Sequence, residues 1–416
     1  MSANANRVIP RRSKLPWSGP DFRARLDAFE PEYSKTSGPG EDTMTLHIQR
    51  HAWPLAAIVA ASAAAWFLGV PAAAQQQRRA LPTFAVDSSW PNAPDKYKLG
   101  DISSIAIDGQ DNAYVLHRPR TLKPENATSA APAVVVFDPA GNFIKAWGGA
   151  GAGYEWPERE HGIHIDHKGF AWIGGNQCPT SGTAGLKAVA DDQLLKFTLD
   201  GKFVLQIGQS NQSKGDADTA NVHRAADAWV LPQTNEVFVA DGYGNHRVIV
   251  FDADTGAFKR TWGAFGKPPG GKDNCAIARV AEFPPGDGLP DFNVAHSIRV
   301  SNDGTVYLAD RENRRVQMFT SDGKFVKQLR QTAEPFAANL AFSPDRDQQF
   351  LYVGGGKAIT IIDRKTFDVL GRVQVEKQLG GGHHIATDSK GNLYIAQTTA
   401  GMQRLLFKGA SGVAGQ

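Results

Sequence analysis

Residues 296–307 read HSIRVSNDGTVY, and the same arrangement of residue types occurs twice more along the chain. Residues 161–172 read HGIHIDHKGFAW, and residues 383–394 read HHIATDSKGNLY. In each copy a glycine follows the histidine by 8 positions and an aromatic residue follows it by 11 positions. Short apolar runs on either side of a glycine turn are typical of a β-hairpin. A hairpin that recurs at a fixed register predicts a repeat protein.

An aromatic residue closes the corresponding hairpin six times, at Tyr114, Trp172, Phe238, Tyr307, Tyr352 and Tyr394. Successive members are 58, 66, 69, 45 and 42 residues apart. The two shortest spacings match one four-stranded propeller blade, so the longer ones contain insertions. A second hairpin follows in most units, with an Asp-Gly turn such as Asp200-Gly201 or Asp322-Gly323, which is a strong local signal for paired strands. Helical periodicity is almost absent from residue 100 onward.

We therefore predict an all-β fold, a six-bladed β-propeller over residues 101–410. Residues 75–100 form a lead-in segment that supplies a closing strand. The predicted blades start near Ile102, His161, Ala226, His296, Asn339 and His383.

Blade counting places His161, His296 and His383 on blades 2, 4 and 6 at one register. The innermost strand of every blade lines the central channel, and alternate blades of a six-fold ring are related by near three-fold symmetry. Three imidazoles at this register can meet at one point, which is the ligand set of a zinc site with an open coordination position. The alternative is that the histidines only fill the channel and form hydrogen bonds there.

Three further candidates lie at blade corners next to the channel mouth. Arg118 and Arg311 occupy equivalent corners of blades 1 and 4, where a guanidinium could hold a carboxylate. Arg311 also lies in a turn motif in which arginines can brace the blade. Tyr243 lies at the matching corner of blade 3 between two glycines, as a general base or as a packing residue. His384 is expected to point away from His383, because neighbouring residues of a strand face opposite sides.

Composition narrows the class of protein. The net charge of +3 over 416 residues is too small to indicate nucleic-acid binding. The two cysteines, Cys178 and Cys275, exclude a Cys-x-x-Cys zinc motif. They form a disulfide if the protein is exported, or are unrelated.

The N-terminal region indicates export. Residues 53–70 are apolar and uncharged, follow Arg50, and precede a Pro-Ala-Ala-Ala sequence. We interpret residues 44–74 as a secretory signal peptide, or as an uncleaved signal anchor. Residues 1–43 are a disordered extension or result from a mis-assigned start. The predicted location is the periplasm or the exterior, or the membrane if residues 53–70 remain as an anchor.

The residues 241–248, DGYGNHRV, and 310–316, DRENRRV, resemble NHL repeats. The ordered motifs of the chain resemble the peptidyl-α-hydroxyglycine α-amidating lyase family over residues 100–400. They are His117-Arg118, His161-Gly162, Asp241-Gly242-Tyr243, His296-Ser297 with residues 309–313, ADREN, and His383.

The resemblance implies that His161, His296 and His383 hold Zn²⁺, that Tyr243 is the base, and that Arg118 and Arg311 assist. It implies cleavage of an α-hydroxyglycine-extended peptide, or a small molecule with the same carboxylate, to an amide and glyoxylate. This sequence shows no copper monooxygenase domain, which leaves two alternatives: a separate monooxygenase partner, or a natural substrate other than a hydroxyglycine peptide.

The chain departs from the family at two positions. His384 stands where the family has an aspartate for structural Ca²⁺, so calcium binding is not carried over by the resemblance. Gly244 stands where the family has a cysteine beside the tyrosine.

Two other functions remain open. One is a non-catalytic NHL propeller that binds a protein or ligand. The other is a different zinc-dependent lyase or hydrolase, such as a lactonase-like enzyme. A pure scaffold has no need for the complete set of site residues, and lactonase propellers use carboxylates and asparagine around calcium, whereas this register offers mainly histidine.

Overall fold

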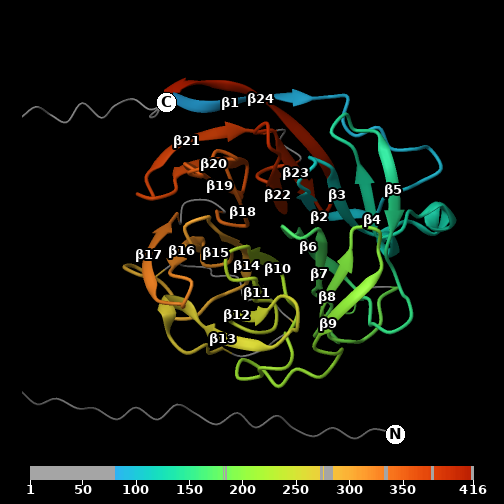
Figure 1. Cartoon of the computed structure of the whole chain (residues 1–416), viewed down its shortest axis with the longest axis horizontal. Helices are drawn as coiled ribbons and strands as arrows, with labels where there is room; N and C mark the ends of the chain where they lie inside the picture. Colours follow the sequence, from blue (N-terminus) through green and yellow to red (C-terminus); the bar gives the residue numbers. More distant parts are fainter. Residues whose placement is uncertain are drawn as a thin grey trace, which may run out of the picture. The chain divides into compact units, whose positions relative to one another are not determined.

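The computed structural model describes residues 80–413, apart from residues 181, 183–184, 272–274, 276–283, 332–335 and 376–378. The described residues form six four-stranded antiparallel sheets, which Figure 1 shows arranged around a common centre. The prediction of an all-β, six-bladed propeller is therefore confirmed. The predicted signal segment and N-terminal extension lie outside the described residues. Among the residues that the structure describes, no helix has the length and apolar character needed to span a bilayer.

Each blade is a four-stranded antiparallel sheet, and the first strand named for each blade below lies at the channel. In blade 6 the fourth, outermost strand is β1, from the start of the described chain. Blade 1 consists of β2 (Asp101–Ile107), β3 (Ala113–Arg118), β4 (Val134–Phe137) and β5 (Phe143–Trp147). Blade 2 consists of β6 (Glu160–Ile165), β7 (Phe170–Gly175), β8 (Leu194–Thr198) and β9 (Phe203–Ile207). Blade 3 consists of β10 (Asp227–Leu231), β11 (Glu236–Asp241), β12 (Arg247–Asp252) and β13 (Phe258–Trp262).

The second half of the ring repeats this arrangement. Blade 4 consists of β14 (Ala295–Val300), β15 (Val306–Asp310), β16 (Arg315–Phe319) and β17 (Phe325–Arg330). Blade 5 consists of β18 (Asn339–Phe342), β19 (Phe350–Gly355), β20 (Ala358–Asp363) and β21 (Val369–Gln374). Blade 6 consists of β22 (His384–Thr387), β23 (Leu393–Gln397), β24 (Gly401–Val413) and β1 (Ala80–Asp87). Three short 3₁₀ helices, Pro119–Thr121, Pro124–Ser129 and Ala264–Gly266, lie in connections.

The ring is closed by strands from the two ends of the described chain. β1 pairs antiparallel with β24, from Ala80 opposite Val413 to Asp87 opposite Arg404 (Figure 1). The Arg404 guanidinium donates to the Asp87 carboxylate through Nε at 2.8 Å. Because blade 6 takes its outermost strand from the lead-in segment, the chain that precedes blade 1 is held in the sheet of the last blade, which closes the ring.

A buried Asp–Asn–Arg motif anchors two of the long insertions. The Asp310 carboxylate accepts hydrogen bonds from Arg315 Nε and Asn313 Nδ2, each at 2.7 Å. Arg315 also donates to the backbone carbonyls of Leu289 and Asp291, at 2.8 and 3.0 Å. Arg315 therefore braces this turn. The alternative that Arg311 is the bracing residue of the motif is not needed to explain it.

Blade 3 repeats the motif with Asp241, Asn245 and Arg247. Arg247 Nη2 donates to the Asn221 carbonyl at 2.8 Å, and Nη1 donates to the carbonyls of Asp216 and Asp218. Each motif thus fixes the insertion that precedes its blade against the channel mouth.

Asp310→Ala is expected to lower the free energy of unfolding by about 3–5 kcal/mol, because it leaves the buried Arg315 charge without its partner. Both side chains of this pair are 0% exposed. Urea denaturation measures the change. The matched control is Asp322→Ala, which breaks the exposed pair with Lys324 and should leave the urea midpoint unchanged. Equal midpoints for the two variants would contradict the bracing role.

Candidate metal centre and cavity

The three histidines of the repeat lie together at one end of the channel. His161 lies in β6, His296 lies in β14, and His383 directly precedes β22. Their ring centroids are 5.0 Å apart for His161 and His296, 4.7 Å for His161 and His383, and 4.9 Å for His296 and His383. The structure therefore brings together the three residues that the sequence placed on alternate blades.

Each of these histidines is oriented by the blade that follows its own. The Nδ1–H groups of His161, His296 and His383 donate to the backbone carbonyls of Ala226, Ala338 and Ser103, at 2.7, 2.5 and 2.6 Å. Ala226 and Ala338 directly precede the first strands of blades 3 and 5, and Ser103 lies in the first strand of blade 1. A carbonyl can only accept, so Nδ1 carries the proton and the Nε2 lone pair is left for a metal ion. Such a backbone partner is the usual orienting contact of a metal-binding histidine.

Two glycines allow the blades to approach closely at the histidines. A Cβ atom on Gly162 would lie 2.4 Å from the Ala226 carbonyl oxygen, the acceptor of His161. A Cβ atom on Gly242 would lie 2.2 Å from the carbonyl oxygen of Ala295, which precedes His296. Side chains at either position would therefore displace the backbone that orients the imidazoles.

Two of the three histidines are fully buried, His383 is of intermediate exposure, and all three rings are neutral at neutral pH. His161 and His296 are 0% exposed. Burial, and then the neighbouring imidazoles or Arg311, lowers the pKa of both rings well below the usual value. Burial and the adjacent His384 do the same for the pKa of His383. Neutral imidazole is the protonation state that binds a metal ion, so the cluster is ready to do so at neutral pH.

The expectation that His384 points away from His383 is wrong. The His384 ring centroid lies 4.9 Å from that of His383, and 5.4 Å from those of both His161 and His296. His383 lies on a bend after Gly382, which has φ +80°, and only His384 belongs to β22. Alternation of side chains therefore does not apply between the two histidines. The ligand atoms of all four histidines lie within 4.8 Å of one another, so the cluster could hold a metal ion.

Tyr243 and Arg311 adjoin the histidine cluster. The Tyr243 hydroxyl donates to His161 Nε2 at 2.9 Å and accepts from Arg311 Nη1 at 2.8 Å. Arg311 Nε donates to Glu312 Oε1 at 2.9 Å, which fixes the guanidinium. The arginine lies 5.3 Å from the centroid of the tyrosine ring. Arg311 therefore holds the phenol oxygen beside the histidine cluster.

A cavity of about 510 Å³ opens over Tyr243 and His383. Its lining includes four arginines, Arg118, Arg159, Arg224 and Arg311, and one carboxylate, Glu312. Arg118 is 4% exposed and donates through Nε to the Glu160 carbonyl at 2.8 Å. Burial, and then the adjacent Arg159, lowers the pKa of Arg118 to about 10, so its guanidinium remains charged at neutral pH. The cavity therefore suits an anionic ligand.

Arg159 and Arg224 were not among the predicted site residues. Both lie in insertions between strands, where neither the blade period nor a motif marks them. The only sequence signal for Arg159 is its position two residues before His161. In the part of the chain that the structure describes, the Arg159 guanidinium forms no hydrogen bond or ion pair, whereas the backbone N–H of Arg159 donates to Asp191 Oδ2 at 3.0 Å.

Two histidines outside the cluster, His117 and His164, form structural contacts. His117 Nδ1 accepts from the Gly100 backbone N–H at 3.1 Å, and Nε2 donates to the Pro132 carbonyl at 3.0 Å. His164 accepts from the Val230 N–H at 3.2 Å and stacks on Trp229.

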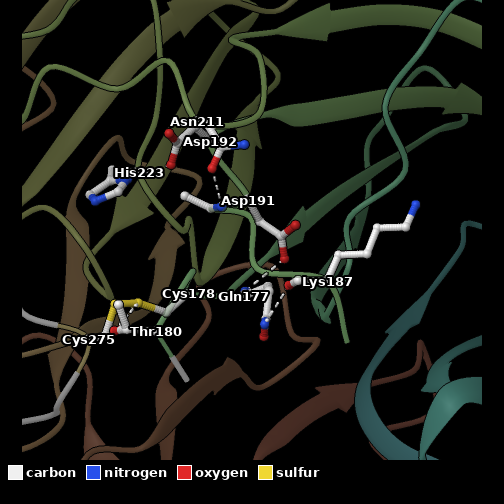
Figure 2. The surroundings of a disulfide bond; sticks show 10 residues. Gln177, Cys178, Thr180, Lys187, Asp191, Asp192, Asn211, His223 and Cys275 are labelled. Atoms are coloured by element: carbon white, nitrogen blue, oxygen red, sulfur yellow. Dashed lines mark hydrogen bonds and ion pairs between the residues drawn. A yellow bond between two sulfur atoms is a disulfide. The ribbon is translucent and has the colours of Figure 1, made fainter. Parts of the chain in front are cut away.

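Cys178 and Cys275 form a disulfide, which settles the alternative that the sequence left open (Figure 2). Their Cα atoms are 5.8 Å apart, and 97 residues separate them in sequence. Both residues line the cavity, so the bond ties the insertions of blades 2 and 3 together beside the site. Tyr243 lines the same cavity as this disulfide and is followed by Gly244.

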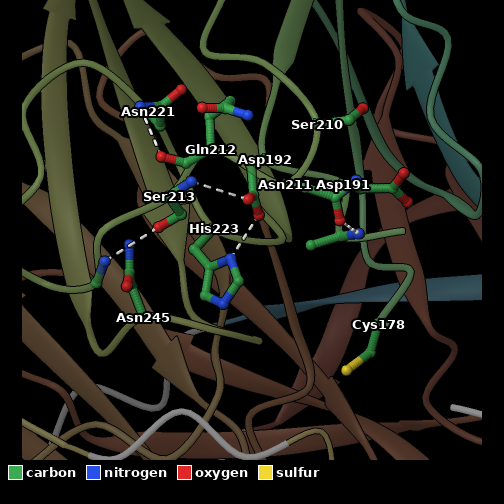
Figure 3. A network of polar contacts seen from close by, with 12 residues as sticks. Cys178, Asp191, Asp192, Ser210, Asn211, Gln212, Ser213, Asn221, His223 and Asn245 are labelled. Atoms are coloured by element: carbon green, nitrogen blue, oxygen red, sulfur yellow. Dashed lines mark hydrogen bonds and ion pairs between the residues drawn. The ribbon is translucent and has the colours of Figure 1, made fainter. Parts of the chain in front are cut away.

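Two adjacent aspartates hold these insertions in place. The Asp191 carboxylate accepts from the backbone N–H groups of Glu158 and Gln177, each at 2.7 Å. Asp192 contacts His223 Nδ1 and accepts from the Ser213 N–H at 3.0 Å (Figure 3). The loops that carry Arg159 and Cys178 are therefore fixed by buried polar contacts.

Fold and site together define an NHL-type propeller with a buried histidine cluster beside an arginine-lined cavity. The NHL repeat family model matches residues 292–319. Peptidyl-glycine alpha-amidating monooxygenase B of Xenopus laevis is 26% identical over 343 residues, covering 76% of this chain and 34% of that protein. Peptidyl-alpha-hydroxyglycine alpha-amidating lyase 2 of Drosophila melanogaster is 25% identical, covering 57% and 51%. NHL repeat-containing protein 3 of mouse is 24% identical, covering 58% of both chains.

The resemblance of this chain to the peptidyl-α-hydroxyglycine α-amidating lyases is thereby confirmed, at low identity. The chain spans about a third of the length of the Xenopus relative.

Proposed function

We propose that the protein is a zinc-dependent lyase of the amidating type, which cleaves the C–N bond of a carbinolamide to give an amide and glyoxylate. One observation carries the proposal. The Tyr243 hydroxyl contacts the metal-facing nitrogen of His161 and the Arg311 guanidinium at once, at 2.9 and 2.8 Å. A base, a metal-binding nitrogen and an anion-binding cation therefore meet at one point beside the cavity.

The histidine cluster fits a zinc ion. His296 Nε2 is buried and has no hydrogen-bond partner among the described residues. The Nδ1 atoms of His161, His296 and His383 already donate to carbonyls, which leaves Nε2 as the donor atom of each ring. Three imidazole nitrogens are a common ligand set of catalytic zinc. Zinc held there supplies a Lewis acid that stabilises negative charge on the substrate hydroxyl oxygen.

The reaction assigned to the residues is balanced in protons. Tyr243 accepts the proton of the substrate hydroxyl as the C–N bond breaks and the carbonyl of glyoxylate forms. The electron pair of the broken bond goes to the amide nitrogen, which takes up one proton. Tyr243 gives that proton to the nitrogen and returns to the phenolate, which Arg311 stabilises before the first transfer and after the second through its hydrogen bond to the Tyr243 oxygen.

Arg118 and Arg159 are proposed to bind the substrate carboxylate. The Nε atom of Arg118 is engaged by the Glu160 carbonyl, which leaves the two terminal nitrogens for a bidentate contact. Both arginines line the cavity. A carboxylate held there is oriented relative to Tyr243, which lines the same cavity.

Export to the periplasm or the exterior is also part of the proposal. A disulfide is typical of oxidising compartments, and the apolar segment at residues 53–70 resembles a signal sequence or membrane anchor. A separate monooxygenase that hydroxylates the glycine carbon would supply the substrate. Nucleic acid is not a proposed partner.

Turnover of α-hydroxyhippurate by the purified full chain tests the function. We expect one glyoxylate per benzamide formed, loss of activity after dialysis against a chelator, and recovery with Zn²⁺ but not with Ca²⁺. Product formation is measured by chromatography. Zinc-loaded, folded protein that yields no glyoxylate would contradict the lyase and favour a non-catalytic propeller or a different zinc enzyme.

A further inference from the structure

We infer that His384 is a fourth ligand of the metal ion, so that the centre is held by four imidazoles and its remaining position faces Tyr243 and the cavity. The proposed function requires only His161, His296 and His383. The fourth ligand is a property of this chain's own residues, and it does not depend on the reaction that the centre performs.

The first support is the position of the ring. The centroid of His384 is 4.9 Å from that of His383 and 5.4 Å from those of His161 and His296. The other three rings lie 4.7 to 5.0 Å from one another, so the four form an almost regular group. Neighbouring nitrogen ligands of a zinc ion that keeps a fifth position open are about 3.0–3.6 Å apart when the metal–nitrogen distance is about 2.1 Å. The four ligand atoms lie within 4.8 Å of one another, so small movements of the rings suffice to reach that spacing.

The second support is an unsatisfied nitrogen. His384 is 1% exposed, and its Nε2 atom is buried without a hydrogen-bond partner among the described residues. Other buried histidines of the channel are satisfied: His117 engages both ring nitrogens, and His164 Nε2 accepts from the Val230 N–H. A buried imidazole nitrogen is rarely left unpaired in a native protein. A metal ion would satisfy it together with His296 Nε2, which is buried and unpaired in the same way.

The third support is the position of the open side. His383 and Tyr243 line the arginine-rich cavity. His384 is almost fully buried at the start of β22 and is not among the residues that line that cavity. Four imidazoles leave a coordination position to the side that carries the phenol, where a substrate oxygen can enter.

The donor set also defines the class of metal. Four neutral nitrogens without a carboxylate suit Zn²⁺, Co²⁺, Ni²⁺ or Cu²⁺, whereas Ca²⁺ requires oxygen ligands. The histidine cluster contains no carboxylate ligand among the described residues.

The test compares zinc-loaded full chain with the variants His384→Ala and His164→Ala. X-ray absorption at the zinc edge counts imidazole ligands, and competition with a chromogenic chelator gives the zinc affinity. We expect four imidazoles in the wild type and three in His384→Ala, with affinity lowered by about 100-fold or more, since even loss of an outer contact costs about 10–100-fold. His164→Ala removes a buried histidine outside the cluster and should retain four imidazoles.

Three imidazoles in the wild-type protein, or an unchanged ligand count and affinity in His384→Ala, would overturn the inference. The wild-type ligand count decides the matter even if His384→Ala fails to fold. No substrate is used in these measurements, so the ligand count and the zinc affinity do not depend on the result of the turnover assay. Replacement of zinc by Co²⁺ gives a second readout, since visible absorption is stronger for four-coordinate than for five-coordinate Co²⁺. We expect the weaker absorption of a five-coordinate ion in the wild type and the stronger absorption of a four-coordinate ion in His384→Ala.

Discussion

His296→Ala is expected to lose the bound metal and to lower kcat/KM by about 10³-fold or more. A metal ion supplies several kcal/mol of transition-state charge stabilisation, and each 1.4 kcal/mol corresponds to about a tenfold change in rate. His296 is suited to this test because its Nδ1 is fixed by the Ala338 carbonyl and its Nε2 has no other partner among the described residues. Elemental analysis of gently purified protein and the glyoxylate assay measure the two effects.

The matched control is His167→Ala. His167 lies exposed on the hairpin turn of blade 2, outside the cluster. This variant should keep the metal content and the rate of the wild type. Substoichiometric transition metal in the wild-type protein, unchanged in His296→Ala, would contradict the metal centre and favour histidines that only fill the channel.

Tyr243→Phe is expected to lower kcat by about 10²–10⁴-fold, the range for loss of a general base. The substitution removes only the hydroxyl that contacts His161 Nε2 and Arg311 Nη1 and keeps the ring. Metal content should therefore stay at the wild-type value, and KM should change little. This separates a chemical role of Tyr243 from a packing role.

Tyr154→Phe is the control for this experiment. The Tyr154 hydroxyl donates to the Gly149 carbonyl at 3.0 Å, and its ring packs on Phe197 and Phe203 between blades 1 and 2. Steady-state kinetics of both variants at saturating zinc provide the comparison. A decrease in kcat of similar size in the two variants would show that Tyr243 acts through folding rather than chemistry.

Local sequence patterns were sufficient for the fold. The glycines of the three histidine-bearing hairpins, Gly169, Gly304 and Gly391, have φ of +78°, +79° and +86°, which explains why glycine recurs at that position. Most neighbouring strands of a blade also follow one another in the chain, so the spacing between hairpins can be read directly from the sequence. The same periodicity identified His161, His296 and His383 before any distance was known.

Contacts between distant segments could not be predicted in this way. Arg159 and Arg224 reach the cavity from insertions that have no period, and the pairing of Cys178 with Cys275 depends on how two insertions fold over the mouth. The prediction for His384 failed because the alternation rule was applied across the bend that precedes β22.

The sequence by itself determined the number of blades and the blade on which each repeated histidine lies, because short-range hairpin spacing encodes both. Only the tertiary structure decided that a fourth imidazole, His384, joins the three repeated histidines and that Arg159 and Arg224 line the same cavity as Tyr243. Ring closure through β1 and β24 brings blade 6 beside blade 1, so that the His383 Nδ1–H reaches the Ser103 carbonyl, 280 residues away in sequence. Such a contact has no local signature, since it depends on the curvature accumulated over all six sheets.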